Sequence, residues 1–208
     1  MKDKGFYAII GVVVLVALAA SGWFAYSGIA KKSEKLPMLG PPGHKVGNFT
    51  LVDQIGDTVT QKILNNKVSI VEYFYTSCTG ICPRMNKNLS KVYQDLKDLK
   101  GFQIISNTVD PATDSVPVLA AYAKERNADP KNWKFLTGPK SQLFSTAIKG
   151  YLLNAADSIG VTGEYVHTQW FALVDQERRI RGFYNGLEKA DMKKLKRDVK
   201  QLLAKEEE

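Results

Sequence analysis

Residues 68–85 read VSIVEYFYTSCTGICPRM, a long apolar run that passes directly into a pair of cysteines. The apolar part, residues 68–75, is typical of a central strand buried on both faces of a sheet. Pro83 suits the first position of a helix. Large apolar side chains then recur at spacings of three and four residues, namely Met85, Leu89, Val92, Leu96 and Leu99. The stretch therefore predicts a buried strand, a loop that carries Cys78, and a helix with Cys82 at its cap position.

Strands and helices alternate on both sides of this unit. Strands are expected at residues 49–54, 58–60, 102–109, 133–136, 170–175 and 179–184, and helices at 116–126, 141–149 and 188–204. Turn residues connect the first two strands and the last two, so each of these pairs predicts a hairpin. The order predicts an α/β domain of the thioredoxin-like plan, a mixed sheet with helices on both faces. The 208 residues leave room for one domain of about 150 to 170 residues beside an N-terminal segment.

The N-terminal segment contains a run without charge, residues 5–26. About 20 apolar residues suffice for a helix to cross a bilayer. Trp23 and Tyr26 stand at the end of the run, where aromatic side chains favour the membrane interface. A cleaved signal peptide is the alternative, because residues 17–19 resemble a small-x-small processing site. The apolar run continues beyond that site, which favours one N-terminal transmembrane helix.

We expect three parts in the chain: an anchor at residues 1–30, a linker rich in proline and glycine at 31–45, and a folded domain at 46–208. Lysines flank both ends of the apolar run, so the positive-inside rule does not decide its orientation. The short N-terminal head favours an N-terminus inside the cell. The expected localisation is therefore a single-pass membrane protein with its domain on the outer side, periplasmic or equivalent.

The net charge of +8 is distributed unevenly. The first 35 residues carry five lysines and two acidic side chains, a net +3, and the remainder carries +5. Much of the latter lies in the expected last helix, at residues 193–200, where such spacing is typical of a solvated amphipathic helix. A docking surface for an acidic partner is the alternative. No nucleic-acid-binding motif accompanies the charge, so nucleic acid is not expected among the partners.

Cys78 and Cys82 are the only two cysteines, with three residues between them. A structural disulfide across so short a loop stabilises by roughly 2 kcal/mol, which a domain with its own core hardly needs. The other two interpretations are a redox couple and a metal site. Both require thiolate, and the start of a helix lowers the pKa of a thiol because its backbone N–H groups favour negative charge. The position of the pair therefore supports either interpretation.

The two histidines separate these interpretations in part. His44 lies in the expected linker and is expected to be solvated. His167 follows a long polar loop and opens a strand, and in the thioredoxin plan the start of that strand faces the cysteine pair. Two thiolates and one imidazole suit Cu(I), whereas a structural zinc ion would require a fourth ligand.

Three blocks of sequence carry a resemblance to a known family. They are YTSCTGICPRM at residues 75–85, VDPATDSVPVL at 109–119, and HTQWFALVD at 167–175 followed by RIRG at 179–182. Over about residues 46 to 205 the chain resembles the Sco/SenC family, membrane-anchored copper proteins that help to assemble cytochrome c oxidase.

The resemblance implies a ligand set and a role. Cys78, Cys82 and His167 are the implied ligands of copper, as Cu(I) and also as Cu(II). The implied partners are the copper-binding subunit of a terminal oxidase and other copper carriers or thiol reductants. The alternative function is a thiol–disulfide oxidoreductase that reduces the copper-site cysteines of that subunit. A peroxidase of related fold is a third and weaker reading.

Two acidic residues are candidates for a supporting role. Asp110 matches an acidic residue that the family keeps near its site, although it could instead cap a turn or helix before Pro111. Glu72 stands six residues before Cys78, at the place of a buried acid in thioredoxin. A carboxyl group among apolar neighbours would have a raised pKa and could exchange protons with the thiols. The alternative for Glu72 is a strand glutamate that reaches solvent.

Overall fold

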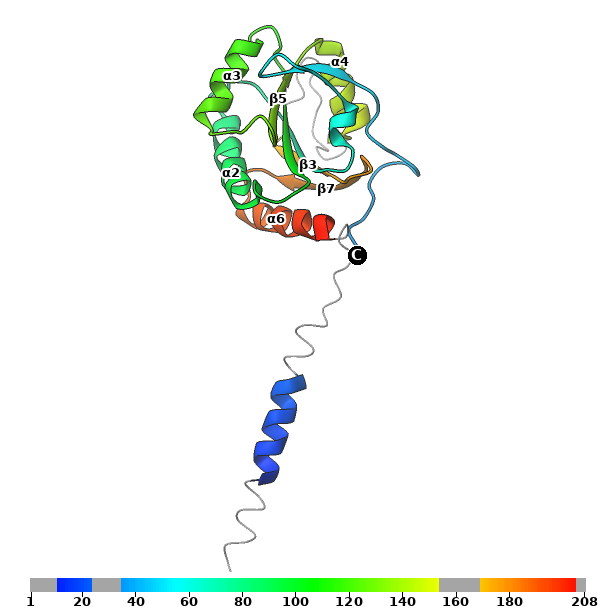
Figure 1. Cartoon of the computed structure of the whole chain (residues 1–208), viewed down its shortest axis with the longest axis vertical. Coiled ribbons are helices and arrows are strands. Elements are labelled where there is room, and N and C mark those ends of the chain that lie inside the picture. Colours follow the sequence, from blue (N-terminus) through cyan, green and yellow to red (C-terminus); the bar gives the residue numbers. More distant parts are fainter. Residues whose placement is uncertain (1–10, 24–34, 154–168, 205–208) are drawn as a thin grey trace, which may run out of the picture. The chain divides into compact units, whose positions relative to one another are not determined.

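The computed structural model describes residues 11–23, 35–153 and 169–204. These belong to two units, Met1–Lys35 and Leu36–Glu208. In the first unit, residues 11–23 form a helix (Figure 1). Among the residues described, no helix combines the length and the apolar character that a membrane crossing requires. The expected anchor falls partly outside the described ranges.

The second unit is built on a seven-stranded mixed sheet with the order β2-β1-β5-β4-β3-β6-β7. The strands are β1 (Thr50–Asp53), β2 (Thr58–Thr60), β3 (Val68–Phe74), β4 (Phe102–Thr108), β5 (Trp133–Thr137), β6 (Trp170–Val174) and β7 (Ile180–Asn185). The three central strands β3, β4 and β5 are parallel, and an antiparallel hairpin lies at each edge. Both predicted hairpins and the mixed sheet are confirmed.

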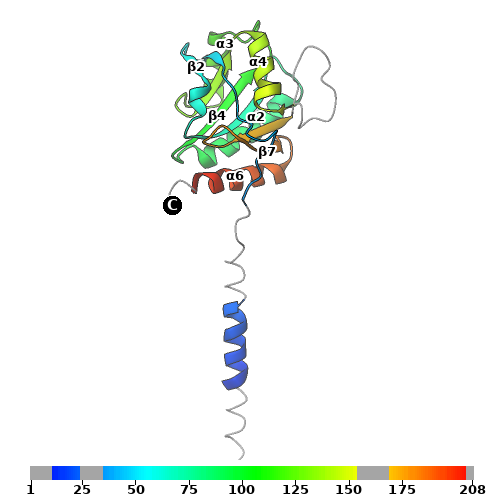
Figure 2. The same cartoon turned by 90° about the vertical axis from the view of Figure 1, so that its right-hand side faces the viewer.

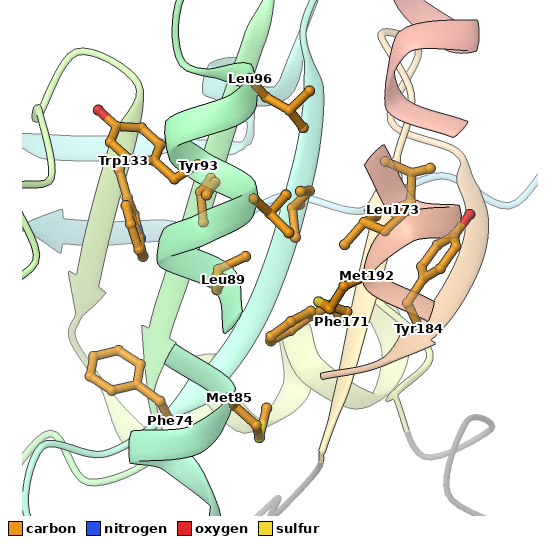
Figure 3. Packing of buried hydrophobic residues seen from close by; sticks show 14 of the residues in the cluster. Phe74, Met85, Leu89, Tyr93, Leu96, Trp133, Phe171, Leu173, Tyr184 and Met192 are labelled. Carbon is orange, nitrogen blue, oxygen red and sulfur yellow. The ribbon is translucent and has the colours of Figure 1, made fainter. Parts of the chain in front are cut away.

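Helices cover both faces of this sheet (Figures 1 and 2). On one face lie α2 (Ile81–Leu96), α3 (Val116–Glu125) and α6 (Lys189–Leu203). On the other lie α4 (Lys140–Ser145) and the π-helical turn η2 (Thr146–Gly150), while the 3-10 helix η1 (Gln61–Leu64) follows β2. The first layer is the more aromatic: Leu89 and Tyr93 of α2 approach Trp133 and Phe171 of the sheet (Figure 3). The predicted arrangement of helices on two faces is confirmed.

The central strand β3 explains why both faces are apolar. Its side chains alternate between the two layers, so Ile70 and Phe74 pack beneath α2 while Val71 and Tyr73 pack in the opposite layer. All seven residues of the strand are buried. By the same alternation Glu72 belongs to the α2 face, between Ile70 and Phe74, and not to solvent.

The chain enters the domain through a clamp at Arg181. The Arg181 side chain donates from Nε to the Pro37 carbonyl at 2.8 Å and from Nη2 to the Leu36 carbonyl. Its Nη1 donates to Asp175 Oδ2 at 2.9 Å. We call this arrangement the Arg181 clamp. Since Arg181 and Asp175 are both buried, the clamp holds the incoming chain on the domain from Leu36 onward.

The segment after the clamp also contacts the domain, although it lies in the stretch expected to be a linker. Leu39 forms an antiparallel bridge with Ile180 of β7, which covers part of the edge of the sheet. His44, expected to be solvated, is half-buried, and its Nε2 lies 2.8 Å from the Gly150 carbonyl oxygen. The sequence pattern did not reveal these contacts because they join residues more than 100 positions apart.

Candidate thiol and metal site

The cysteines lie where β3 passes into α2, as the sequence predicts. The helix begins earlier than expected, at Ile81, with Gly80 as its cap. Cys82 is therefore in the first turn and Pro83 is the third helical residue. The first four N–H groups of a helix have no partner within the helix, so a proline, which lacks this group, fits there as well as at the first position.

Both cysteines are free thiols that are largely withdrawn from solvent, with Cys78 8% and Cys82 3% exposed. Burial opposes ionisation of Cys78. Hydrogen bonds from the Cys82 thiol, from the backbone N–H groups of Cys82 and Gly80, and from the Tyr75 side chain outweigh it and lower the pKa of Cys78. The backbone N–H groups at the start of the helix thus favour the Cys78 thiolate, whereas the same expectation is wrong for Cys82.

Cys82 has the opposite character. Burial raises its pKa to about 12, assisted by the hydrogen bond with Cys78 and by the negative charges of Cys78 and Glu72. The two thiols therefore titrate as a pair in which Cys78 loses its proton first. Such a pair offers one thiolate for nucleophilic attack and a second thiol held against it. Deprotonated, the same two sulfurs are soft donors of the kind that Cu(I) prefers.

Glu72 lies beneath this pair and is fully buried. Ser106 Oγ donates to Glu72 Oε1 at 2.6 Å, and Trp133 Nε1 donates to Ser106 Oγ at 2.9 Å. Its second oxygen, Oε2, has no hydrogen-bond partner among the described residues. Burial raises the pKa of Glu72 to about 7, and the Ser106 hydrogen bond and the Arg126 charge offset this only in part. The solvent-exposed alternative for Glu72 is therefore wrong.

Asp110 lies shortly after the last residue of β4, close to the C-terminal end of β3, because the two strands are parallel and Phe74 pairs with Thr108. Its backbone N–H donates to Thr108 Oγ1 at 2.9 Å, and its carbonyl accepts from the Asp114 N–H at 2.9 Å. No hydrogen bond of the described residues involves its carboxylate. The backbone of Asp110 thus forms the turn, and a part for its carboxylate in the site stays a prediction.

Asp114 is a residue of the site that sequence reasoning missed. Its carboxylate is fully buried and accepts from the Thr76 N–H, at 3.3 Å to Oδ1 and 3.2 Å to Oδ2. The Thr76 hydroxyl donates to Oδ1 and the Thr108 hydroxyl to Oδ2. Asp114 therefore joins the loop that carries Cys78 to the end of β4. The sequence signal that could have indicated Asp114 is a pair of hydroxyl side chains, Thr76 and Thr108, at the ends of two neighbouring strands.

His167, the third expected ligand, lies outside the described residues. Among the described residues, no three histidine, cysteine or acidic side chains gather as a metal site. The following strand is described: β6 begins at Trp170 and runs antiparallel to β3, with Ile70 opposite Leu173. The first residues of β6 therefore lie next to the last residues of β3.

A mixed sheet with helices on both faces, and a thiol pair between its central strand and the next helix, defines a thioredoxin-like protein. Comparison with protein families is more specific. The model of the SCO1/SenC family matches residues 39–204, which is well over half of the sequence. The chain belongs to the SCO1/SenC family.

Solved structures of three proteins illustrate the likeness. A SCO1/SenC family lipoprotein from Bacillus anthracis is 26% identical, with 80% of this chain and 99% of that chain covered and a TM-score of 0.67. BsSco, a member of the Sco family of cytochrome c oxidase assembly proteins with an identified disulfide switch, is 27% identical, with 79% and 96% covered and a TM-score of 0.65. Bradyrhizobium japonicum ScoI with copper bound is 27% identical, with 76% and 99% covered and a TM-score of 0.60.

Proposed function

We propose that this protein is a copper chaperone that binds copper through Cys78, Cys82 and His167 and delivers it to the copper-binding subunit of cytochrome c oxidase. The observation that carries the proposal is the thiol pair, held in hydrogen-bonding contact between β3 and α2 with one pKa lowered and the other raised. Two sulfur donors suit Cu(I). The similar protein ScoI has copper bound.

Copper binding requires both thiols to lose their protons, so the affinity rises with pH over the range in which thiols and imidazole titrate. Cys78 is the easier of the two to ionise, and the proton of Cys82 is the one that must be displaced. The buried carboxyl of Glu72, close enough to raise the pKa of Cys82 through its charge, is the group with which that proton exchanges. Asp110, at the same edge of the sheet, is proposed as a further acidic neighbour of the site.

His167 is proposed as the third ligand because of its place in the chain. It precedes the first residue of β6 by three positions, and β6 begins at the edge of the sheet that carries the thiols. An imidazole added to two thiolates also allows the same site to hold Cu(II).

We further propose that residues 5–26 anchor the chain in a membrane as one helix, with the domain on the outer side. These 22 residues carry no charge, and a helix of this length is long enough to cross a bilayer. The related Bacillus anthracis protein is a lipoprotein. In this sequence the only cysteines are Cys78 and Cys82, so the proposed anchor is a helix and not a lipid-modified cysteine.

The test is a Cu(I) titration of the reduced full chain against a competing chelator, with wild type and His167→Ala. We expect one copper ion per chain for wild type. Loss of one ligand should weaken copper binding at least tenfold, about 1.4 kcal/mol, while the dithiol still cycles between its reduced and oxidised forms. Cys78→Ser and Cys82→Ser should each abolish both properties. If the wild-type protein binds no Cu(I), the proposal that it is a copper chaperone is refuted.

A thiol–disulfide oxidoreductase is the second candidate, favoured by the free thiols of unequal pKa. It would reduce the copper-site cysteines of the oxidase subunit. This reaction needs an attacking thiolate, a leaving thiol and access, but no metal ligand. If His167→Ala keeps wild-type copper affinity and loses disulfide exchange, the histidine belongs to the redox reaction and the second candidate takes precedence.

A further inference from the structure

The positive charge of the domain is concentrated on two helices. Together α2 and α6 carry nine lysine and arginine side chains and three carboxylates, a net +6. The remainder of Leu36–Glu208 carries 15 cations and 16 carboxylates, a net −1. The basic character of this unit therefore comes entirely from α2 and α6, which lie about 100 residues apart in the sequence.

The two helices lie side by side in the layer beneath the sheet (Figures 1 and 2). Asp95 Oδ2 of α2 is 2.6 Å from Lys196 Nζ of α6, and Asn88 Nδ2 donates to the Gly186 carbonyl just before α6 at 2.9 Å. Their outward side chains form one surface, which we call the basic face: Lys87, Lys91, Lys193, Lys196, Arg197 and Lys200. The last four, with Asp95, line an open groove.

Among the described residues, few carboxylates neutralise this face. Asp95 pairs with Lys196, and Asp198 lies 3.0 Å from Arg197 Nε. No ion pair of the described residues involves Lys87, Lys91, Lys193 or Lys200.

A soluble amphipathic helix gains from opposite charges four residues apart and loses a few tenths of a kcal/mol for each like pair. Here Lys87 and Lys91, Lys193 and Arg197, and Lys196 and Lys200 are like pairs at that spacing. Opposite charges stand at the same spacing at Lys91 and Asp95 and at Lys194 and Asp198, so like pairs outnumber opposite pairs and solubility alone does not require the pattern.

Two lysines of the basic face lie on the same helix as Cys82. Cys82 lies in the first turn of α2, and Lys87 and Lys91 follow it by about 8 and 14 Å along the helix axis. A stable protein interface covers about 800 Å² on each partner. A protein that reaches Cys78 over this end of the domain would therefore cover part of the basic face as well. A bilayer lying on the same face would place lipid, and not a partner's sulfur, beside the thiols.

We propose that the basic face is a docking surface for a protein partner with an acidic surface beside its own cysteines, and that attraction between the two guides the partner onto Cys78. The inference deepens the proposed function, because it states the charge of the surface from which the partner takes copper or electrons. Complementary charge of this kind raises the rate of encounter at low salt, often by one order of magnitude or more.

The test uses the reduced full chain in phosphatidylcholine vesicles and two synthetic peptides. Each peptide has one cysteine carried as its 2-pyridyl disulfide, flanked by six glutamates in one peptide and six glutamines in the other. The Cys78 thiolate attacks the peptide sulfur and releases 2-thiopyridone, which is measured. Cys82 then attacks Cys78, releases the peptide thiol and leaves the Cys78–Cys82 disulfide. We expect the glutamate peptide to react at least about fivefold faster at low ionic strength, with the preference lost near 0.5 M salt.

Two triple variants decide whether the basic face is responsible. Lys87→Gln, Lys91→Gln and Lys193→Gln together should abolish the preference for the glutamate peptide. Lys62→Gln, Lys131→Gln and Lys149→Gln remove the same charge from exposed positions outside α2 and α6 and should retain it. Equal rates for the two peptides with wild type, the result expected of a face that rests on a membrane, would overturn the proposal. If both triple variants lose the preference for the glutamate peptide equally, the proposal is overturned as well. The assay contains neither copper nor oxidase, so its outcome is independent of the copper titration.

Discussion

Glu72 carries a carboxyl group that folding removes from water completely. One oxygen accepts from Ser106 and the other has no partner among the described residues. In this setting the neutral acid is the favoured form, and the pKa rises from its ordinary value of 4.5 to about 7. A single residue therefore couples the stability of the fold to pH near neutrality.

The sign of that coupling follows from proton uptake. Between pH 4.5 and 7 the native state holds the Glu72 proton and the unfolded chain has lost it, so the free energy of unfolding falls as the pH rises. The full change is on the order of 3 kcal/mol, since each pKa unit corresponds to about 1.4 kcal/mol. Urea unfolding of the reduced full chain at pH 5 and pH 8 should show this loss for wild type and not for Glu72→Gln. Glu125→Gln, at an exposed position, should behave as wild type; an unchanged pH dependence in Glu72→Gln would assign the effect elsewhere.

At the scale of elements, Asp114 binds the segment around Thr76, which lies 38 residues before it in the sequence. Thr76 belongs to the segment between β3 and α2, and Thr108 ends β4. Both donate to the same buried carboxylate. The segment that carries Cys78 is thereby held against the rigid end of a central strand. Asp110, four residues away, contributes backbone groups to the same turn.

The pair Asp110 and Asp114 permits a matched test. Hydrogen bonds to a charged acceptor contribute about 1.5–3 kcal/mol each, so Asp114→Asn should lower the free energy of unfolding by at least about 2 kcal/mol. The alkylation rate of Cys78 at fixed pH should change with it, because Thr76 is no longer held in place. Asp110→Asn should change the stability by less than about 0.5 kcal/mol, because no hydrogen bond or ion pair of the described residues involves its carboxylate. If the two variants unfold alike, the carboxylate of Asp114 does not hold the loop.

The elements of the domain were predictable because their signals are local. Apolar runs and spacings of three and four residues gave every strand and helix on which the site depends, and the position of the thiol pair between β3 and α2. For Glu72 the sequence left two possibilities, a buried acid and a strand residue that reaches solvent, and the structure has the buried acid. The start of α2 was less certain because a proline fits any of its first positions. The choice between Asp110 and Asp114 depends on a turn whose hydrogen bonds join separate elements, and no local pattern contains it.

At the scale of the whole molecule, the Arg181 clamp shortens the connection between the folded domain and the proposed anchor. With the proposed anchor ending at residue 26 and the clamp holding Leu36, nine residues remain between them. Fully extended they span at most about 30 Å. With an anchor as proposed, the distance that the domain can reach from the membrane is therefore set by the point where the chain meets Arg181.

Tether length is directly testable in cells. Inserting ten residues of glycine and serine after Lys32 raises the free length from nine to 19 residues. The local concentration of the domain at a membrane-bound partner falls with about the −3/2 power of tether length, so delivery should slow about threefold. The rate of oxidase maturation under limiting copper measures this. The same insertion after Leu203, at the end of α6, controls for added length alone; equal rates for the two insertions would show that tether length does not limit delivery.

A short tether also lowers the affinity that the domain needs for a membrane-bound partner. A domain confined within some tens of ångströms of the bilayer meets a membrane-bound partner at an effective concentration on the order of millimolar. A complex with a dissociation constant in that range, about −4 kcal/mol, would be half-occupied on the membrane and undetectable in dilute solution. Such a complex also separates within a short time, so one molecule can serve many partners in succession. By holding Leu36 and Pro37, the Arg181 guanidinium thus allows a weak and short-lived complex to suffice, where a freely diffusing carrier would need a higher affinity for its partner.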